Sequence, residues 1–173
     1  MRMVLTEPFP KEIDDLLARR RAHGLDTHDE VWNGEYHMSP AAHPDHAFTQ
    51  SELHGVLRPI ARRAELVTLA EINVGTPNDF RVPDLVVARR RPVDLYVVDD
   101  VAIVVEVLSA RDEAWQKFDH YADHGVTEIF MVDPQAQTVQ FFVRPADGTE
   151  FVDQPDSPLL SITTAWLADR LDW

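Results

Sequence analysis

Apolar residues follow two spacings along the chain, and together these spacings predict a mixed α/β fold. Short segments that are apolar throughout or at every second position are typical of strands, whereas apolar residues three and four positions apart are typical of helices. Strands are expected at residues 65–74, 82–88, 101–108, 127–132 and 138–143. Helices are expected at residues 10–22, 44–63, 112–124 and near 163–171. The helices should pack against a mixed β-sheet.

Glycine and proline residues set the expected ends of these elements. Asn33-Gly34 lies between alternating apolar residues in 29–39, and this dipeptide is a strong signal for a β-hairpin. Gly24 is expected to end the first helix. Pro59 is expected to kink the long helix or to shorten its end, because proline lacks the amide hydrogen that a helix needs.

The length of 173 residues and the 45% hydrophobic content suit a single domain with one substantial core. Its centre is expected at about 43–145, with a helix and hairpin at 10–40 before it and a C-terminal helix at about 163–171. No apolar run reaches the roughly 18 residues of a membrane span. The first residues lack a signal-peptide pattern. The absence of cysteine excludes disulfides and thiolate metal sites, and we expect a cytoplasmic protein.

The charge balance argues against strong nonspecific binding to nucleic acid. The chain has 16 Lys and Arg against 30 Asp and Glu, a net charge of −14 with a pI near 4.8. Proteins that bind DNA without sequence preference usually have a basic surface, because phosphate contacts supply most of their affinity. The arginines do cluster, at 19–21, 62–63 and 89–91, so a local positive rim is compatible with the sequence.

One acid interrupts the most apolar segment of the chain. Residues 101–108 suit a central strand that is covered on both faces, and Glu106 lies near its end. An ionised carboxylate in such a place costs free energy unless a cation, a metal or several hydrogen bonds compensate. Two interpretations follow. Glu106 leaves the core at the end of the strand and meets water or an arginine, or it binds a cation.

Asp84 favours the second interpretation. Side chains alternate along a strand, so Asp84 shares a face with Val86, and Glu106 shares a face with Val104. If the two strands pair antiparallel with Val86 opposite Val104, then Asp84 lies opposite Glu106. Two like charges in this position are destabilising unless a divalent cation lies between them. Oxygen ligands without cysteine indicate Mg²⁺ or Mn²⁺, and the Val107 carbonyl could add a ligand.

Lys117 is the candidate cation for chemistry at such a site. A bound metal of this kind polarises a phosphoryl oxygen and activates water, and phosphodiester hydrolysis also needs a positive charge near the phosphorus. Lys117 lies on the helix that follows the Glu106 strand and borders its apolar stripe. The alternative for a single helical lysine is an ordinary solvated side chain.

Four short motifs occur in a characteristic order: Pro83-Asp84, Glu106-Val107-Leu108-Ser109, Lys117-Phe118-Asp119-His120-Tyr121, and the segment from Gly125 to Pro134. In this order the chain resembles the Uma-two family of restriction endonucleases, a branch of the PD-(D/E)XK nuclease superfamily. The resemblance covers roughly residues 29–150 and includes Asn33-Gly34-Glu35, Met38-Ser39-Pro40 and His46.

The resemblance implies an α/β restriction-endonuclease-like core, in which helices flank a mixed sheet, and a Mg²⁺-dependent nuclease site acting on DNA. Asp84 and Glu106 match the metal-binding acids of the family. The superfamily lysine two residues after the second acid is replaced here by Leu108. The resemblance implies that the following helix supplies this lysine instead, at Lys117.

Three further residues are possible accessories to the site. Glu35 and His46 match family positions, and Glu71 lies on the strand before Asp84. Glu35 either reaches the metal as a third carboxylate or lies at the surface of the hairpin. His46 is interpreted as a histidine of the core or one that supports the ligands, with direct ligation as the alternative. Glu71 is interpreted as an outer acid. A homodimer is also expected, from the resemblance and from the frequency of symmetric dimers.

Three functions therefore remain open at this point. The leading hypothesis is a hydrolase, a Mg²⁺- or Mn²⁺-dependent endonuclease that cleaves DNA phosphodiester bonds. The second is a catalytically inactive or weakly active module that keeps the fold for binding or dimerisation, which the net charge favours. The third keeps the metal site for a small phosphoester. The sequence contains no P-loop, dinucleotide-binding or GxSxG motif.

Overall fold

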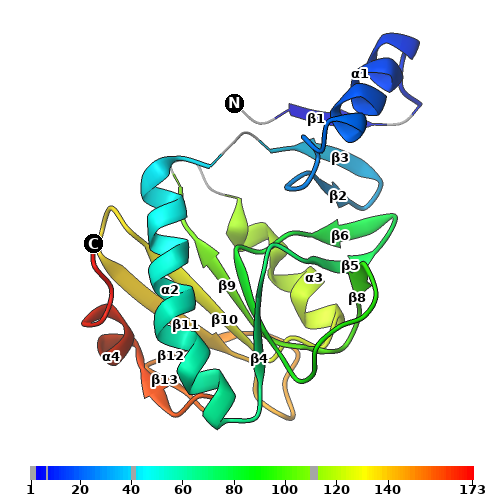
Figure 1. The fold of residues 1–173 in the computed structure, drawn as a ribbon. Coiled ribbons are helices and arrows are strands. Elements are labelled where there is room, and N and C mark those ends of the chain that lie inside the picture. The colour runs from blue at the N-terminus through cyan, green and yellow to red at the C-terminus, as the bar shows by residue number, and fades with distance from the viewer. Residues whose placement is uncertain (1–2, 7, 40–41, 110–112) are drawn as a thin grey trace.

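The computed structural model describes residues 3–6, 8–39, 42–109 and 113–173. These residues form a mixed α/β structure with two six-stranded sheets (Figure 1). Pro40 and the expected helix start at Asp112 lie outside the described residues.

The first sheet has the strand order β1-β3-β2-β6-β5-β8 and contains the predicted hairpin. Its strands are β1 (Met3–Thr6), β2 (Glu30–Trp32), β3 (Glu35–Met38), β5 (Asn73–Thr76), β6 (Asp79–Arg81) and β8 (Tyr96–Val97). The turn between β2 and β3 is Asn33-Gly34, and both residues have positive φ, which is the reason this dipeptide favours a two-residue hairpin. The hairpin prediction is therefore confirmed.

The second sheet has the order β12-β11-β10-β9-β7-β4 and contains the apolar core. Its strands are β4 (Val67–Ala70), β7 (Leu85–Ala88), β9 (Val101–Val107), β10 (Glu128–Asp133), β11 (Thr138–Val143) and β12 (Val152–Gln154). Strand β9 pairs antiparallel with β7 and parallel with β10, and every one of its residues is buried. A short ladder of β13 (Asp156–Ser157) and β14 (Ile162–Thr163) follows.

Helices cover the second sheet on both faces. They are α2 (Pro44–Arg63), the 3₁₀ turn η1 (Ala114–Lys117), α3 (Phe118–Asp123) and α4 (Thr164–Ala168). Helix α1 (Lys11–Ala22) lies apart from this sheet, beside β1 and β3 (Figure 1). Leu53 and Leu57 of α2 belong to the apolar cluster on one face, together with Val105 of β9. Tyr121 of α3 belongs to the cluster on the other face, together with Val104. This double cover explains why 101–107 is apolar at nearly every position.

Several expected boundaries were wrong for identifiable reasons. The strand expected at 65–74 is two strands, β4 and β5, in different sheets, because Glu71 has a left-handed backbone (φ 53°) that interrupts the extended chain. The strand expected at 82–88 begins only at Leu85. Helix α2 continues past Pro59 to Arg63, since the buried Ile60 and Ala61 hold its last turn against the core.

The helix expected at 112–124 begins with a 3₁₀ turn at Ala114. The C-terminal helix, expected near 163–171, is shorter and spans Thr164–Ala168. The short strands β1, β6, β8, β12, β13 and β14 were not predicted. Within the described part of the chain, no helix has the length and apolar character needed to cross a membrane.

Candidate active site

Asp84 and Glu106 lie at facing positions of neighbouring strands. Strands β7 and β9 pair antiparallel with Val86 opposite Val104 and Leu85 opposite Val105. One more step in this register places Asp84 opposite Glu106. The register assumed from the sequence is therefore confirmed, and it places two acids at the same end of the two strands.

Hydrogen bonds from β9 and α2 hold Asp84 in place. Its Oδ2 accepts a 2.6 Å hydrogen bond from the Val107 amide, which ties it to β9. Its Oδ1 lies 2.7 Å from Nε2 of His46, near the start of α2. Gln50, one turn further along α2, donates to the Asp84 backbone carbonyl at 2.7 Å. The carboxylate is thus fixed, while 18% of the side chain remains exposed.

Glu106 lies deeper, with 6% of its side chain exposed. Its Oε1 accepts hydrogen bonds from the Tyr121 hydroxyl and from Nζ of Lys117, the latter at 3.1 Å. Lys117 and Tyr121 are four residues apart and therefore lie on the same side of the η1–α3 segment. Burial raises the pKa of Glu106 to about 7; the Lys117 ammonium opposes this rise, and the nearby Asp84 carboxylate adds to it.

Lys117 is a buried ammonium held between two carboxylates. Its Nζ is 3.0 Å from Oε1 of Glu30 and 3.1 Å from Oε1 of Glu106, and 9% of its side chain is exposed. Burial by itself would lower the pKa of Lys117, but the two carboxylates outweigh this effect and hold it above its usual value. Lys117 therefore carries a positive charge at neutral pH, and it is not a solvated surface side chain.

Glu30 is the residue of this cluster that the sequence reasoning missed. It lies on β2, is 3% exposed and accepts hydrogen bonds from the Val82 amide at 2.8 Å and from Nε1 of Trp32 at 2.7 Å. One signal could have identified it. Residues two apart on a strand share a face, so Glu30 shares the face of the large apolar Trp32, which is the face most expected to be buried.

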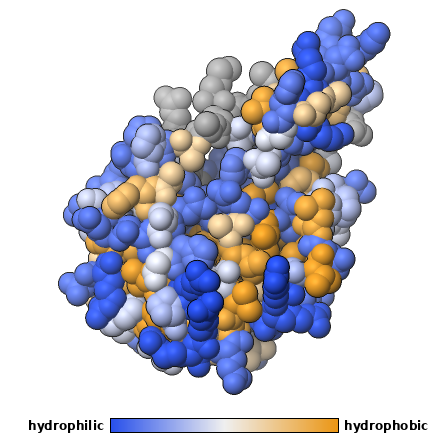
Figure 2. Space-filling model, in the orientation of Figure 1, coloured by the Kyte–Doolittle hydropathy of each residue, from blue (hydrophilic) through white to orange (hydrophobic). Residues whose placement is uncertain are grey.

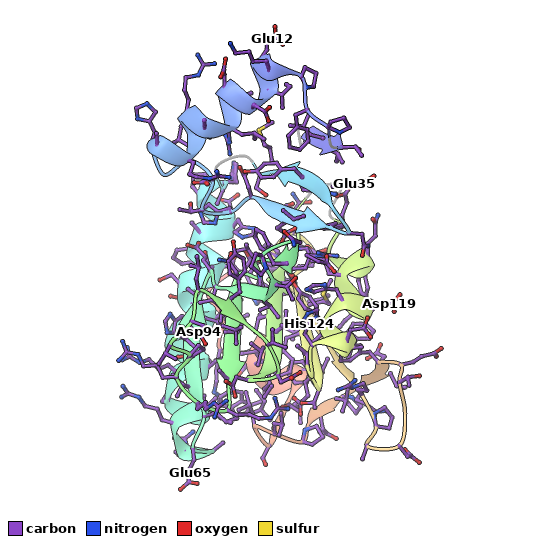
Figure 3. All side chains as sticks on the ribbon, turned by 90° about the vertical axis from the view of Figure 1, so that its right-hand side faces the viewer. Glu12, Glu35, Glu65, Asp94, Asp119 and His124 are labelled. Atoms are coloured by element: carbon purple, nitrogen blue, oxygen red, sulfur yellow. The ribbon has the colours of Figure 1, made fainter. Side chains whose placement is uncertain are left out.

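The structure does not bring Glu35 to the two acids. Its side chain is 52% exposed beside the hairpin turn, 4.0 Å from Nε2 of His37, and Figure 3 shows it at the outer edge of the hairpin. Glu71 is 44% exposed and accepts a 3.2 Å hydrogen bond from Gln50, the residue that also contacts Asp84. Glu71 is thus linked to Asp84 through one intervening side chain.

The donor atoms fit a magnesium-type ion. The described residues contain no group of three His, Cys, Asp or Glu side chains arranged around a metal position. Mg²⁺, however, is usually bound by one or two carboxylates and keeps several waters. Within the described chain, Oε2 of Glu106 has no hydrogen-bond partner. The Val107 amide points to Asp84. Because the carbonyl of a strand residue faces the same edge as its amide, the Val107 carbonyl also faces the Asp84 side.

The arginine clusters do not surround these acids. Arg20 and Arg90 are paired with Asp29 and Asp100, each at 2.8 Å. The 89–91 cluster follows the end of β7 remote from Asp84. The 62–63 pair lies at the end of α2. At a rise of about 1.5 Å per residue, this is about 24 Å along the helix from His46. The positive rim that the sequence allowed is therefore not built from the 62–63 and 89–91 clusters.

A comparison with protein families gives a match over residues 14–168 to Uma2, described as "Putative restriction endonuclease". The chain belongs to the Uma2 family. The resemblance inferred from the short motifs is thereby confirmed over most of the chain. Nucleases of this kind generally use a divalent metal, which agrees with the oxygen donors at Asp84 and Glu106.

The solved structures confirm the fold of this Uma2 protein. A crystal structure of "a putative nuclease belonging to DUF820" from Anabaena variabilis ATCC 29413 is similar to it with a TM-score of 0.62. The match covers 82% of this chain and 89% of that chain at 20% sequence identity, so it supports the fold and not the details of the site. A comparison with curated proteins gives no match.

Proposed function

We propose that this Uma2 protein is a metal-dependent endonuclease that hydrolyses DNA phosphodiester bonds at Asp84, Glu106 and Lys117. One observation carries the proposal: the register of β7 and β9 sets two carboxylates at facing positions, and a buried ammonium lies 3.1 Å from one of them. A buried arrangement of two acids and a lysine costs free energy, so its presence at the end of the central strands indicates a chemical role.

Asp84, Glu106 and the Val107 carbonyl would hold Mg²⁺ or Mn²⁺. A divalent ion bound there polarises a phosphoryl oxygen and lowers the pKa of a water molecule. The Val107 amide and His46 orient Asp84, while Tyr121 orients Glu106. Lys117 provides a fixed positive charge beside the acids, where it stabilises the negative charge that develops on the phosphoryl oxygens.

The test is cleavage of a supercoiled plasmid and of a labelled duplex oligonucleotide with Mg²⁺ or Mn²⁺. Glu106→Gln and Asp84→Asn should each lower the cleavage rate by about 10²–10³, the range found when one catalytic electrostatic contact is removed. Glu128→Gln is the matched control, because Glu128 is also a buried strand glutamate but interacts with Ser157 and Leu159. Equal rates in the wild type and in Glu106→Gln would contradict the proposal.

A second candidate is an inactive module that keeps the fold for binding or dimerisation. Two observations favour it: Lys117 and Tyr121 already satisfy Oε1 of Glu106, and the chain carries a net charge of −14. This candidate predicts a folded protein that neither binds Mn²⁺ nor cleaves DNA. Activity on bis-p-nitrophenyl phosphate without activity on DNA would instead identify a small phosphoester as the substrate.

We also propose that the protein acts in the cytoplasm as a homodimer. Apolar side chains gather on the right of the face in Figure 2, over β5 and β8. Near the edge strand β8, Val93 is 94% exposed and Leu95 72% exposed. Exposed apolar patches of this kind commonly take part in association. Light scattering on the purified protein should give twice the chain mass of 19.7 kDa; a monomer would contradict the dimer.

A further inference from the structure

The N-terminal hairpin contributes a carboxylate to a site that otherwise belongs to the second sheet. Glu30 is on β2, yet its Oε1 lies 3.0 Å from Nζ of Lys117. The ammonium is therefore shared almost equally between Glu30 and Glu106, at 3.0 and 3.1 Å. A lysine needs one carboxylate to balance its charge, so the second one requires an explanation.

Glu30 is held firmly, so Lys117 is the group of this pair that can move. The Val82 amide donates to its Oε1 and Nε1 of Trp32 donates to its Oε2, so both oxygens are fixed by groups other than Lys117. Lys117 has a long, flexible side chain. If Glu30 were absent, the ammonium could pair fully with Glu106, the acid that faces Asp84.

The charges of these side chains favour a divalent cation at the site. Asp84, Glu106 and Glu30 carry three negative charges when ionised, and the Lys117 ammonium contacts both glutamates. One ammonium and one divalent ion balance three carboxylates. A buried excess of negative charge is costly, so the three acids together favour the binding of a divalent cation.

We infer that Glu30 is a positioning residue that holds Lys117 away from Glu106, so that the Glu106 carboxylate is available to a divalent cation. This inference rests on the proposed function, because it concerns the same metal site. It gives the hairpin a role in the site: β2 supplies no ligand, but it controls how strongly Lys117 competes with the metal.

Isothermal titration with Mn²⁺ tests this inference without relying on catalysis. Glu30→Gln should bind Mn²⁺ about 10–100-fold more weakly than the wild type, the usual effect of losing a group that orients a metal ligand. Cleavage should show a lower kcat, a higher Mn²⁺ requirement and an unchanged KM for the oligonucleotide. Glu128→Gln should match the wild type in all three quantities.

Trp32→Phe separates position from charge. This variant removes the hydrogen bond to Oε2 of Glu30 but leaves every charge in place. It also tests the inference if Glu30→Gln does not fold. Weaker Mn²⁺ binding in Trp32→Phe supports positioning. Wild-type affinity in a folded Trp32→Phe, together with a loss in Glu30→Gln, would show that Glu30 acts only through its charge and would overturn the inference.

Lysine NMR gives a readout that needs no metal. The chain has two lysines, Lys11 and Lys117, so a sample labelled with ¹⁵N-lysine gives two side-chain signals, with Lys11 as the internal reference. Glu30→Gln should shift the Lys117 ammonium signal, and Glu128→Gln should not. An unshifted signal would overturn the inference.

The outcomes separate the inference from the proposed function. Mn²⁺ binding by the wild type that Glu30→Gln weakens, without cleavage of any substrate, would keep the inference and overturn the nuclease proposal. Cleavage and Mn²⁺ binding that are equal in the wild type and in Glu30→Gln would support the nuclease proposal and overturn the inference. A wild type that binds no Mn²⁺ would overturn both.

Discussion

Removing the Lys117 charge should destabilise the protein in a way that depends on pH. In Lys117→Met, the buried carboxylates of Glu106 and Glu30 lose the ammonium at 3.1 and 3.0 Å. Removing one partner of a buried ion pair typically costs about 3–5 kcal/mol. At about 2–4 °C per kcal/mol for a domain of this size, the melting temperature should fall by about 6–20 °C near pH 8.5.

The sign of the pH dependence follows from Glu106. Its folded pKa of about 7 lies above the ordinary value, so folding favours the protonated form, and the stability contribution of this group is lost as pH rises toward that pKa. In Lys117→Met the folded pKa of Glu106 should rise further, because a favourable charge is gone. At about pH 5 the Glu106 carboxyl is protonated in both proteins, so only the loss of the ammonium beside Glu30 remains and the difference in stability should be smaller there; it should grow above about pH 7.

The assay is thermal unfolding by circular dichroism in EDTA at both pH values. Lys11→Met is the matched control, since Lys11 is the other lysine of the chain and is exposed at the start of α1. The control should unfold at the wild-type temperature at both pH values. A Lys117→Met protein as stable as this control near pH 8.5, or a deficit that is the same at both pH values, would refute the reasoning.

Two further predictions test the support of the site and the backbone around it. His46→Ala removes the group 2.7 Å from Oδ1 of Asp84, so Mn²⁺ affinity and cleavage rate should each fall about 10–100-fold in titrations, and unchanged values would show that His46 does not orient Asp84. Gly75→Ala would place a Cβ against the Asp79 carbonyl oxygen at φ +125°, so calorimetry should show a loss of at least about 1–3 kcal/mol. In contrast, Gly55→Ala in α2 meets no atom within 4 Å and should be neutral or stabilising; equal stability of the two alanine variants would contradict the prediction.

The paired acids could be predicted because strand periodicity is a local property. A carboxylate in an apolar strand is anomalous in the sequence itself, and side-chain alternation is enough to align Asp84 with Glu106 once Val86 is set opposite Val104. Lys117 followed because it is close in sequence and borders a helical apolar stripe. Both inferences used short-range patterns, which the structure preserves.

Glu30 and the two-sheet arrangement could not be predicted in the same way. Glu30 contacts Lys117 across 87 positions of sequence, and no local pattern marks that pairing. The division of residues 65–74 between two sheets depends on one left-handed residue, Glu71, a glutamate that carries no turn signal. Glu35 is singled out in the sequence because it matches a family position and follows the Asn-Gly turn, but the position beside the turn is exposed, and the buried glutamate lies at the start of β2.

The central claim is that Asp84 and Glu106 form a metal-dependent nuclease site, and the most direct test is the Mg²⁺-dependent cleavage rate of a duplex oligonucleotide by three proteins. The wild type and Glu128→Gln should cleave at equal rates with Mg²⁺ and not at all in EDTA. Glu106→Gln should be slower by about 10²–10³. Cleavage by Glu106→Gln at the wild-type rate, or no cleavage by the wild type with Mg²⁺ or Mn²⁺, would contradict the claim.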